Sequence, residues 1–423
     1  MNCLITLLLA ASMLAAPSDS TYTVQIEDAT SLIKPEYRNM ARMLAISPGF
    51  VPTCGNEFQL LTEGRQYGDL LYNDFRNARE LIELELFLFG QDEDGAQARD
   101  ILFGKIKEGV EVRYTHDNFG NFFDNIFDGR KVFTGYYTNL RKGGINMRNF
   151  AKWWRVDPTF TYPGYRNHRK INIIDKEIAY TGGMNITVGS ISGWGDAMLR
   201  ITGPAVQSLR SILLLNWNDL ATKPSEKEKF NLTVGGNPVP GGKILQVVAD
   251  GADQPAYMAE DAMIWVLDHA REYVWFETPY FLPNRQLIKA FKRAAARGVD
   301  VRVIIPVDSD LPALDPAFRS CFEECVKGGV KILYRRPPFN HSKTFLCDDY
   351  ITCVGSTNLD KLSLKRLYEV NVYIYDEQTA LERKAYFLDA QEGATAVDQA
   401  MFDSWDGSER FKQFIFGFAS PWL

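Results

Sequence analysis

The stretch NHRKINIIDKEIAYTGGMN, residues 167–185, has a second copy in the chain, NHSKTFLCDDYITCVGSTN, residues 340–358. In each copy a Lys, an Asp, a Gly and an Asn follow a His by 2, 7, 14 and 17 residues, and an acid follows it by 28. A repeat in one register predicts two equivalent half-sites. The paired residues are His168 and His341, Lys170 and Lys343, Asp175 and Asp348, Gly182 and Gly355, Asn185 and Asn358, and Asp196 and Glu369.

The spacing of these residues predicts a pocket for a phosphate group. A His and a Lys two residues apart lie on one face of a strand, because strand side chains alternate. The β-prone runs INIID and TFLCD follow them. After a second short strand, Gly-Gly-Met-Asn or Gly-Ser-Thr-Asn brings N–H groups and an amide to the same point. Gly183 and Ser356 occupy matching positions there and are candidate substrate-binding residues. Cations and N–H donors around an imidazole suit a phosphate beside a nucleophile.

Two such half-sites together suggest a mechanism. The two Lys and two Asn side chains would offset the negative charge of a phosphodiester in the transition state. One imidazole would attack phosphorus, and the other would protonate the leaving alcohol and deprotonate the acceptor. Asp196 and Glu369 would hold the rings in the correct tautomer. We expect no metal and no cofactor, since Lys and His supply the charge and the protons. For Asp175 and Asp348 we expect salt bridges at the strand ends.

At these residues the chain resembles the phospholipase D superfamily, whose signature H-x-K-x4-D followed by G-[GS]-x-N occurs twice. It is most similar to bacterial cardiolipin synthases, from about residue 54 to the end, in RITGPAV (200–206), NWNDLAT (216–222), ETPYFLPN (277–284) and SPWL (420–423). The resemblance implies His168 as the nucleophile and His341 as the acid and base. One segment departs from the family. WGDAM has Gly195 and Met198 where the family usually has Arg and His, which leaves the acceptor open.

The repeated segments predict an α/β fold made by internal duplication. We expect two mixed or parallel sheets flanked by helices, related by a pseudo-twofold axis, with the active site between the halves. Segments outside the motif also repeat: AREL (78–81) matches AREY (270–273), and GVEVR (109–113) matches GVDVR (298–302). Glu85 and Glu277 occupy equivalent places. We expect a first half at 54–230, a linker at VGGNPVPGG (234–242) and a second half at 243–423.

Each half shows a β-α-β pattern, which implies parallel strand pairs. In the first half we expect helices over about 66–80 and 96–108, and strands over 81–89 and 109–114. In the second half we expect helices over about 259–270 and 284–297, and strands over 273–281 and 298–306.

The reaction that the resemblance implies is phosphatidyl transfer between two phosphatidylglycerol molecules, with release of glycerol and a phosphohistidine intermediate. The alternative is a phospholipase D-type phosphodiesterase, a lipid hydrolase or a nuclease, that uses water as the acceptor. A net charge of −6 argues against nucleic acid as a partner. A silent membrane-binding scaffold is disfavoured, because both copies keep His, Lys and Asn. The sequence points to no protein partner.

Both ends of the chain, and one segment within it, have features that suit a membrane surface. Residues 1–20 contain an apolar run at 4–16, shorter than the roughly 20 residues of a membrane span. We expect an export or membrane signal there, or a start that docks on the body. Residues 119–165 mix aromatic and basic residues, and FKQFIFGFASPWL (411–423) is aromatic. Either segment would pack on the body or contact lipid headgroups. We therefore expect the bacterial cell membrane as the location, peripheral or tethered, and envelope-facing if the start is an export signal.

Overall fold

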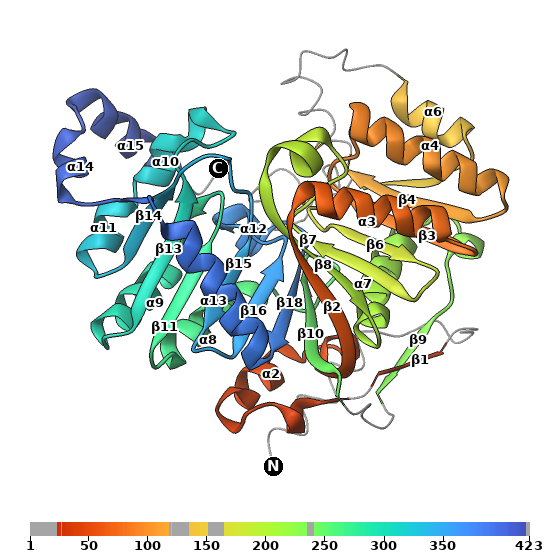
Figure 1. The fold of residues 1–423 in the computed structure, drawn as a ribbon, viewed down its shortest axis with the longest axis horizontal. Helices are drawn as coiled ribbons and strands as arrows, with labels where there is room; N and C mark the ends of the chain where they lie inside the picture. Colours follow the sequence, from red (N-terminus) through yellow and green to blue (C-terminus); the bar gives the residue numbers. More distant parts are fainter. Residues whose placement is uncertain are drawn as a thin grey trace.

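The computed structural model describes residues 23–26, 28–117, 120, 135–150, 165–234 and 241–419 (Figure 1). Residues 1–20, most of the aromatic segment 119–165, part of the linker 234–242 and the terminal SPWL lie outside the described residues. What the sequence predicts for them stays a prediction.

The strands of the first half are β2 (Thr53–Glu63), β3 (Leu81–Leu86), β4 (Glu111–Asp117), β5 (Asn146–Phe150), β6 (Ile171–Ile174), β7 (Ile178–Gly182) and β8 (Gly195–Thr202). Those of the second half are β10 (Lys243–Asp250), β11 (Tyr273–Glu277), β13 (Asp300–Pro306), β14 (Lys331–Arg335), β15 (Thr344–Cys347), β16 (Ile351–Gly355), β18 (Glu369–Tyr375) and β19 (Thr395–Ala396). All belong to one sheet of 15 strands. A separate two-stranded sheet pairs β1 (Thr23–Ile26) with β9 (Asn231–Val234).

The strand order repeats between the halves. The order β8-β7-β6-β3-β4-β5 on one side corresponds to β18-β16-β15-β11-β13-β14 on the other. In both series the last three strands are parallel and the first four are antiparallel. The predicted α/β fold, with a mixed sheet flanked by helices, is confirmed (Figure 1).

Two details of the predicted sheets are wrong. The halves share one sheet instead of having one each, because β10 pairs antiparallel with β18 on one edge and with β2 on the other. The predicted strand 273–281 ends at Glu277, and Phe281–Leu282 forms β12, which pairs with β17 (Leu359–Asp360). Pro279 lies between them and has no N–H group for a continuous ladder.

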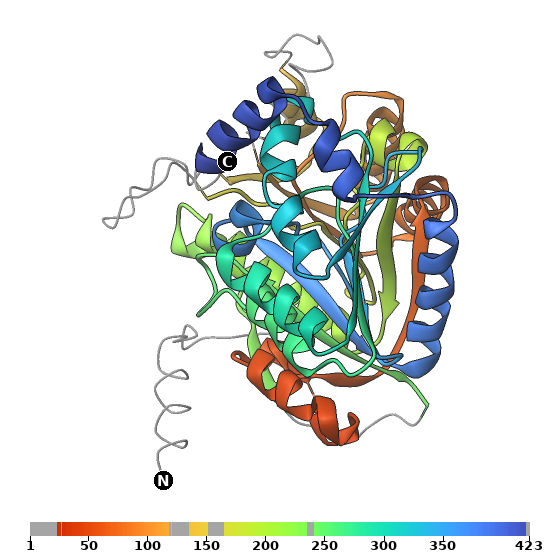
Figure 2. The ribbon, with the colours of Figure 1, turned by 90° about the vertical axis from the view of Figure 1, so that its left-hand side faces the viewer.

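Helices lie on both sides of the sheet (Figure 2). The predicted helices at 66–80, 96–108, 259–270 and 284–297 are present, with each end within three residues of its predicted position. Asn284 caps the last of them by accepting hydrogen bonds from the N–H groups of Gln286 and Leu287. The helices are α2 (Arg38–Leu44), α3 (Gly64–Asn77), α4 (Glu93–Lys107), α6 (Tyr136–Lys142), α7 (Ala205–Asp219), α8 (Ala259–His269), α9 (Arg285–Ala296), α10 (Asp315–Arg319), α11 (Phe322–Lys327), α12 (Lys361–Lys365), α13 (Glu377–Gln391), α14 (Gln399–Ser404) and α15 (Gly407–Ala419).

The largest hydrophobic core contains residues of both halves. Leu209 of α7 and Ile171 of β6 belong to it together with Val266 of α8 and Val247 of β10. A second core packs α3 and α4 against β3 and β4, and a small third core contains Trp275 of β11. Because the main core spans both halves, burial of apolar surface itself fixes one half against the other.

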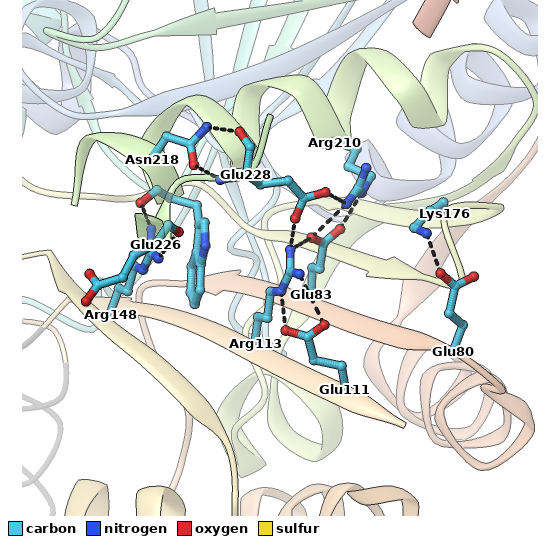
Figure 3. Close-up of polar contacts among 11 residues, drawn as sticks. Glu80, Glu83, Glu111, Arg113, Arg148, Lys176, Arg210, Asn218, Glu226 and Glu228 are labelled. Atoms are coloured by element: carbon cyan, nitrogen blue, oxygen red, sulfur yellow. Dashed lines mark hydrogen bonds and ion pairs between the residues drawn. The ribbon is translucent and has the colours of Figure 1, made fainter. Parts of the chain in front are cut away.

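A buried polar cluster holds α7 and the segment after it against the first half (Figure 3). The carboxylate of Glu83 on β3 accepts hydrogen bonds from Arg210 of α7 at 2.6 Å and from Arg113 of β4 at 3.0 Å. Glu228 bonds the same two arginines. Burial raises the pKa of Glu83, and the charge of Arg210 opposes that rise. The cluster fixes the register of α7, whose Asn216 reaches toward the functional site described below.

The two motif aspartates lie in equivalent hairpin turns. Asp175 and Lys176 have φ values of 51° and 64°, and Asp348 and Asp349 have values of 48° and 51°. Two successive positive φ values are typical of a type I′ turn. Each motif carboxylate accepts three backbone N–H groups at the start of a central strand. Asp175 binds those of Arg79, Glu80 and Leu81 at 2.8, 2.8 and 2.9 Å, and Asp348 those of Arg271, Glu272 and Tyr273 at 2.7, 2.9 and 3.0 Å.

These contacts correct the expectation of salt bridges, because the partners are backbone donors. The donors belong to the repeated segments AREL and AREY, so these segments lie in equivalent places in the two halves. Partial burial raises the pKa of Asp175, but the N–H groups of Leu81 and its neighbours lower it more, so this pKa lies below its usual value.

We predict that Asp175→Ala lowers the free energy of unfolding at pH 7 by about 2 kcal/mol, since hydrogen bonds to a charged acceptor are lost. Urea denaturation measures it, with Glu177→Ala, an exposed side chain in the same turn, as the control. Because the folded-state pKa of Asp175 is depressed, its contribution is complete above the unfolded pKa of about 3.9 and disappears as the pH falls through the folded value. A difference between the two variants that persists at still lower pH would contradict this account.

Candidate active site

The two motif histidines lie where the halves meet, each held by backbone hydrogen bonds from the opposite half. The carbonyl of Tyr368 accepts the N–H of His168 at 2.9 Å, and the N–H of Tyr368 donates to Arg166 at 2.8 Å. Gly195 holds the other histidine, since its carbonyl accepts the N–H of His341 at 2.7 Å. Tyr368 and Gly195 are the residues directly before the two motif acids. The backbone therefore delivers each acid to the histidine of the other half.

The side chains pair across the halves in the same way, so each histidine contacts the motif acid of the other half. Nδ1 of His168 lies 3.0 Å from Oε1 of Glu369, and Nδ1 of His341 lies 2.8 Å from Oδ2 of Asp196. An ionised carboxylate can only accept, so in that form each acid favours the tautomer with the proton on Nδ1. The nitrogen suited to attack or proton transfer is then Nε2. Each imidazole depends on a carboxylate that the other half supplies.

The motif lysines lie beside their own histidines, as the spacing of two residues predicts. Nζ of Lys170 donates to the carbonyl of His168 at 2.7 Å, and Nζ of Lys343 donates to the carbonyl of His341. Nζ of Lys343 also lies 2.6 Å from Nδ1 of His341, but that nitrogen already gives its proton to Asp196. Burial lowers the pKa of Lys170 to about 7 and that of Lys343 to about 8. A bound anion would favour both ammonium forms.

Burial controls the charge of the two imidazoles. It lowers the pKa of His168 well below its ordinary value, and the positive charges of Lys170 and Lys343 lower it further. The pKa of His341 is also lowered by burial and by Lys343, but Asp196 opposes this. Neutral imidazole, the nucleophilic form, is therefore favoured at His168, whereas His341 has a partner that stabilises its protonated form.

Gly183 and Ser356 occupy matching positions beside the two motif acids but make different contacts with them. The hydroxyl of Ser356 donates to Oε2 of Glu369. Burial raises the pKa of Glu369 to about 8, although Lys170 and this hydroxyl oppose the rise. At the matching position a Cβ built on Gly183 would lie 2.1 Å from Oδ1 of Asp196, so a side chain there would displace that acid. Both residues touch the acids, and their predicted contact with substrate stays a prediction.

The motif asparagines are both buried, with 3% of each residue exposed. Oδ1 of Asn185 accepts the N–H of Leu88 at 3.2 Å, which ties it to the segment after β3. Oδ1 of Asn358 is buried and has no hydrogen-bond partner among the described residues. The two amides are thus held differently. Their role in binding phosphate stays a prediction.

A second pair of repeated contacts supports the site, and the motif spacing does not point to it. The amide of Asn167 donates to Glu85 at 2.8 Å, and the amide of Asn340 donates to Glu277 at 3.3 Å. Asn216 of α7 donates to the same oxygen of Glu85 at 2.8 Å. The sequence signals for these contacts are an Asn directly before each His and a Glu at equivalent positions of β3 and β11. They anchor the residue that precedes each motif histidine.

Arg169 lies between His168 and Lys170 and supports only one of the two half-sites. Its guanidinium donates to the backbone carbonyl of Glu369 at 3.2 Å and to both carboxylate oxygens of Asp253 at 2.7 and 2.8 Å. The second motif has Ser342 at this position, so no repeat in the sequence signals the arginine. Arg169 holds the backbone of the acid that contacts His168.

The two positions that depart from the family pattern lie in different environments. Met198 is fully buried in the core of the first half, beside Gly182 in strand register. Its counterpart Asn371 donates to the hydroxyl of Thr357 at 2.8 Å. A Cβ on Gly195 would have its nearest neighbour, Oδ1 of Asn340, at 3.5 Å, which is ordinary contact. Met198 therefore serves packing, while the site has room for a side chain at Gly195.

Two kinds of feature are absent from the described residues. Across 28–117, 135–150, 165–234 and 241–419, no three His, Cys, Asp or Glu side chains form a group that could hold a metal ion. In the same part of the chain no helix has the length and apolar character needed to cross a membrane.

The chain is similar in sequence or fold to several known proteins. A family model described as "Cardiolipin synthase, PLD-like domain" matches residues 263–390. The chain is 31% identical over 398 residues to cardiolipin synthase 1 of Staphylococcus aureus, covering 92% of this chain and 78% of that protein. It is 30% identical to a cardiolipin synthase of Listeria monocytogenes, covering 84% and 73%. The fold is similar to phosphatidylserine synthase of Haemophilus influenzae, with a TM-score of 0.66, 14% identity and coverage of 86% and 95%.

The exchange of acids can be tested without any assay of activity. In protein labelled with ¹⁵N at histidine, we predict that Asp196→Ala changes the ring resonances of His341 and leaves those of His168 unchanged. Glu369→Gln should have the opposite pattern, because the acid that each ring contacts lies in the other half. His269, whose Nδ1 contacts the carbonyl of Trp265 on α8, is the internal control. Changes at the histidine of the same half would contradict the exchange.

Proposed function

The chain belongs to the cardiolipin synthases of the phospholipase D superfamily, and from that premise we propose that it is a phosphatidyltransferase. It joins two phosphatidylglycerol molecules into cardiolipin and releases one glycerol. The observation that supports this best is the pair of imidazoles, with 12% and 9% of their side chains exposed, each with a carboxylate from the other half and a lysine beside it. Such a pair can divide one transfer into two displacements at phosphorus.

In the first displacement Nε2 of His168 attacks phosphorus of one phosphatidylglycerol. The bond from phosphorus to the glycerol headgroup oxygen breaks, and His341 gives a proton to that oxygen. In the second displacement His341 takes a proton from the headgroup hydroxyl of another phosphatidylglycerol. That oxygen attacks phosphorus, the bond to Nε2 of His168 breaks, and cardiolipin leaves. Both histidines then have their starting protonation.

The assignment of His168 as nucleophile rests on the family resemblance and on the charge around each ring. Burial and two lysines keep His168 neutral, which suits attack. Asp196 supports the protonated form of His341, which suits an acid and base. Lys170, Lys343, Asn185 and Asn358 are proposed to offset the charge of the phosphoryl oxygens. The mechanism uses no metal ion and no cofactor.

The acceptor and the place of action complete the proposal. The acceptor is a headgroup hydroxyl of phosphatidylglycerol, and water in its place would make the enzyme a phosphodiesterase. The enzyme works on phospholipid at the surface of a bacterial membrane, as a peripheral protein or tethered through residues 1–20, and faces the envelope if those residues are an export signal. The net charge of −6 disfavours nucleic acid as a substrate.

Product analysis tests the reaction. With phosphatidylglycerol vesicles and excess chelator, we predict that mass spectrometry finds cardiolipin and glycerol in equal amounts. His168→Ala and His341→Ala should each lower turnover by about 10³-fold or more. His269→Ala, an exposed histidine on α8, is the matched control and should retain full activity. Phosphatidic acid without cardiolipin would show that water is the acceptor and that the transferase proposal is wrong.

The roles of the two histidines can be separated with a substrate whose leaving group needs no proton. With a phosphatidyl ester of p-nitrophenol, we predict that His341→Ala still releases p-nitrophenol in a burst and gains the mass of one phosphatidyl group. His168→Ala should show neither the burst nor the added mass. The reverse pattern would assign the nucleophile to His341.

A further inference from the structure

The C-terminal helix α15 exposes a large apolar surface. Phe411, Phe414 and Ile415 have 65%, 70% and 45% of their surface exposed, and the two phenylalanines exceed every other large apolar side chain in the described residues. These three residues are called the outer face of α15 here. With about 100° of rotation per residue, positions 411, 414 and 415 lie on one side of a helix. Apolar residues on one helix face normally point to the core.

The helix is instead fixed with its polar side inward. Glu409 pairs with Arg319 of α10 at 3.1 Å, and Gln413 bonds Glu409. A Cβ on Gly417 would lie 3.1 Å from the side chain of Ser320, so the helix backbone passes close to the residue that follows α10. Positions 409, 413 and 417 are four residues apart and form one stripe opposite the outer face. The contacts with α10 therefore hold the phenyl rings away from the protein.

The helix that carries the outer face packs on an element that reaches the active site. α15 packs on α10, and the two helices lie together in both views of the ribbon (Figure 1, Figure 2). Phe318 of α10 stacks on Tyr280 with ring centroids 5.4 Å apart. The ring of Tyr280 lies 6.3 Å from that of His341. A short series of packed aromatic rings thus connects His341 to α10, on which α15 packs.

We propose that the outer face of α15 docks the enzyme on the lipid bilayer that contains its substrate. This inference rests on the proposed function, because phosphatidylglycerol resides in a bilayer and its phosphate must reach His168 and His341 from there. Phenylalanine and isoleucine would enter the boundary between headgroups and acyl chains, as amphipathic helices do at interfaces. Docking at α15 would bring the bilayer to the side of the molecule where α10 packs on Tyr280.

The charges beside the outer face favour an anionic lipid surface over a second copy of the chain. Arg410 and Lys412 are exposed and flank the apolar residues on the two sides of the helix. Arg410 lies 3.8 Å from Glu323, so its charge is partly offset within the chain. Two copies packed through this face would still bring the Lys412 residues of both copies close together, which is unfavourable at a small interface. Phosphatidylglycerol headgroups carry the complementary negative charge.

The test compares two sets of substitutions in the full chain. Phe411→Ser, Phe414→Ser and Ile415→Ser together remove the outer face. Leu381→Ser and Leu388→Ser are the matched control, since these leucines of α13 are also exposed, at 46% and 44%. Co-sedimentation with phosphatidylglycerol vesicles measures binding. Turnover is measured on the same vesicles and on short-chain phosphatidylglycerol below its micelle concentration. Circular dichroism checks that each variant is folded.

We expect the triple variant to bind vesicles at least about tenfold more weakly, because apolar surface no longer leaves water. Its turnover should fall on vesicles and stay unchanged on the short-chain lipid, whereas the double control should behave as wild type in both. Vesicle binding that is unchanged in the triple variant overturns the proposal. So does a loss of self-association in light scattering without a loss of vesicle binding, which would assign the face to a second copy. If binding falls as expected but wild type makes no cardiolipin, the docking surface stands and the proposed reaction is wrong.

Discussion

The hydrogen bond between an imidazole of one half and a carboxylate of the other is the contact on which this site depends. Nδ1 of His168 needs Glu369, and Nδ1 of His341 needs Asp196. Neither half alone contains a ring held in a defined tautomer. The contact is buried, so it requires the halves to be placed to within a hydrogen-bond length. Backbone bonds at Tyr368 and Gly195, a shared sheet and a shared core provide that placement.

The duplication supplies two equal half-sites, and small differences then give them different roles. Asp196 has room beside Gly183, while the longer Glu369 is bonded by the hydroxyl of Ser356. Arg169 holds the backbone of Glu369 and has no counterpart in the second motif, where the residue is a serine. Burial lowers the pKa of both imidazoles; two lysines lower that of His168 further, whereas Asp196 opposes the decrease at His341. Nucleophile and acid–base are different tasks, and an exact twofold site would serve neither as well.

The sequence predicts this structure where the information is local or repeated. The mixed α/β fold and the positions of four helices follow from periodicity and from repeated segments such as AREL and AREY. The spacing of two residues places each lysine at its histidine, and that contact is present at Lys170 and Lys343. The exchange of acids is not predictable in this way. Asp196 and Glu369 follow their own histidines by the same 28 residues, and only the tertiary arrangement decides which ring each one meets.

Other errors have the same origin. The single sheet depends on β10 having partners on both edges, which no local pattern states. For the motif aspartates the charge pattern predicts salt bridges, because no sequence pattern indicates which backbone N–H groups a carboxylate will accept. The repeat does not predict the role of Arg169, because the second motif has a serine at that position. In each case the contact that determines the structure joins two segments that are distant along the chain. Only one of the two segments has a pattern that the sequence reveals.

Burial of the lysines gives the site a property that a surface cluster would lack. Lys170 and Lys343 have pKa values lowered to about 7 and about 8, so their ammonium charge is weakly held when the pocket contains no anion. A phosphodiester placed beside them favours protonation, because an opposite charge in a buried site raises the pKa of an amine. The positive charge that offsets the transition state is then complete only when substrate is present. In the empty pocket burial weakens both ammonium charges, which limits the cost of holding two cations close together in a buried site.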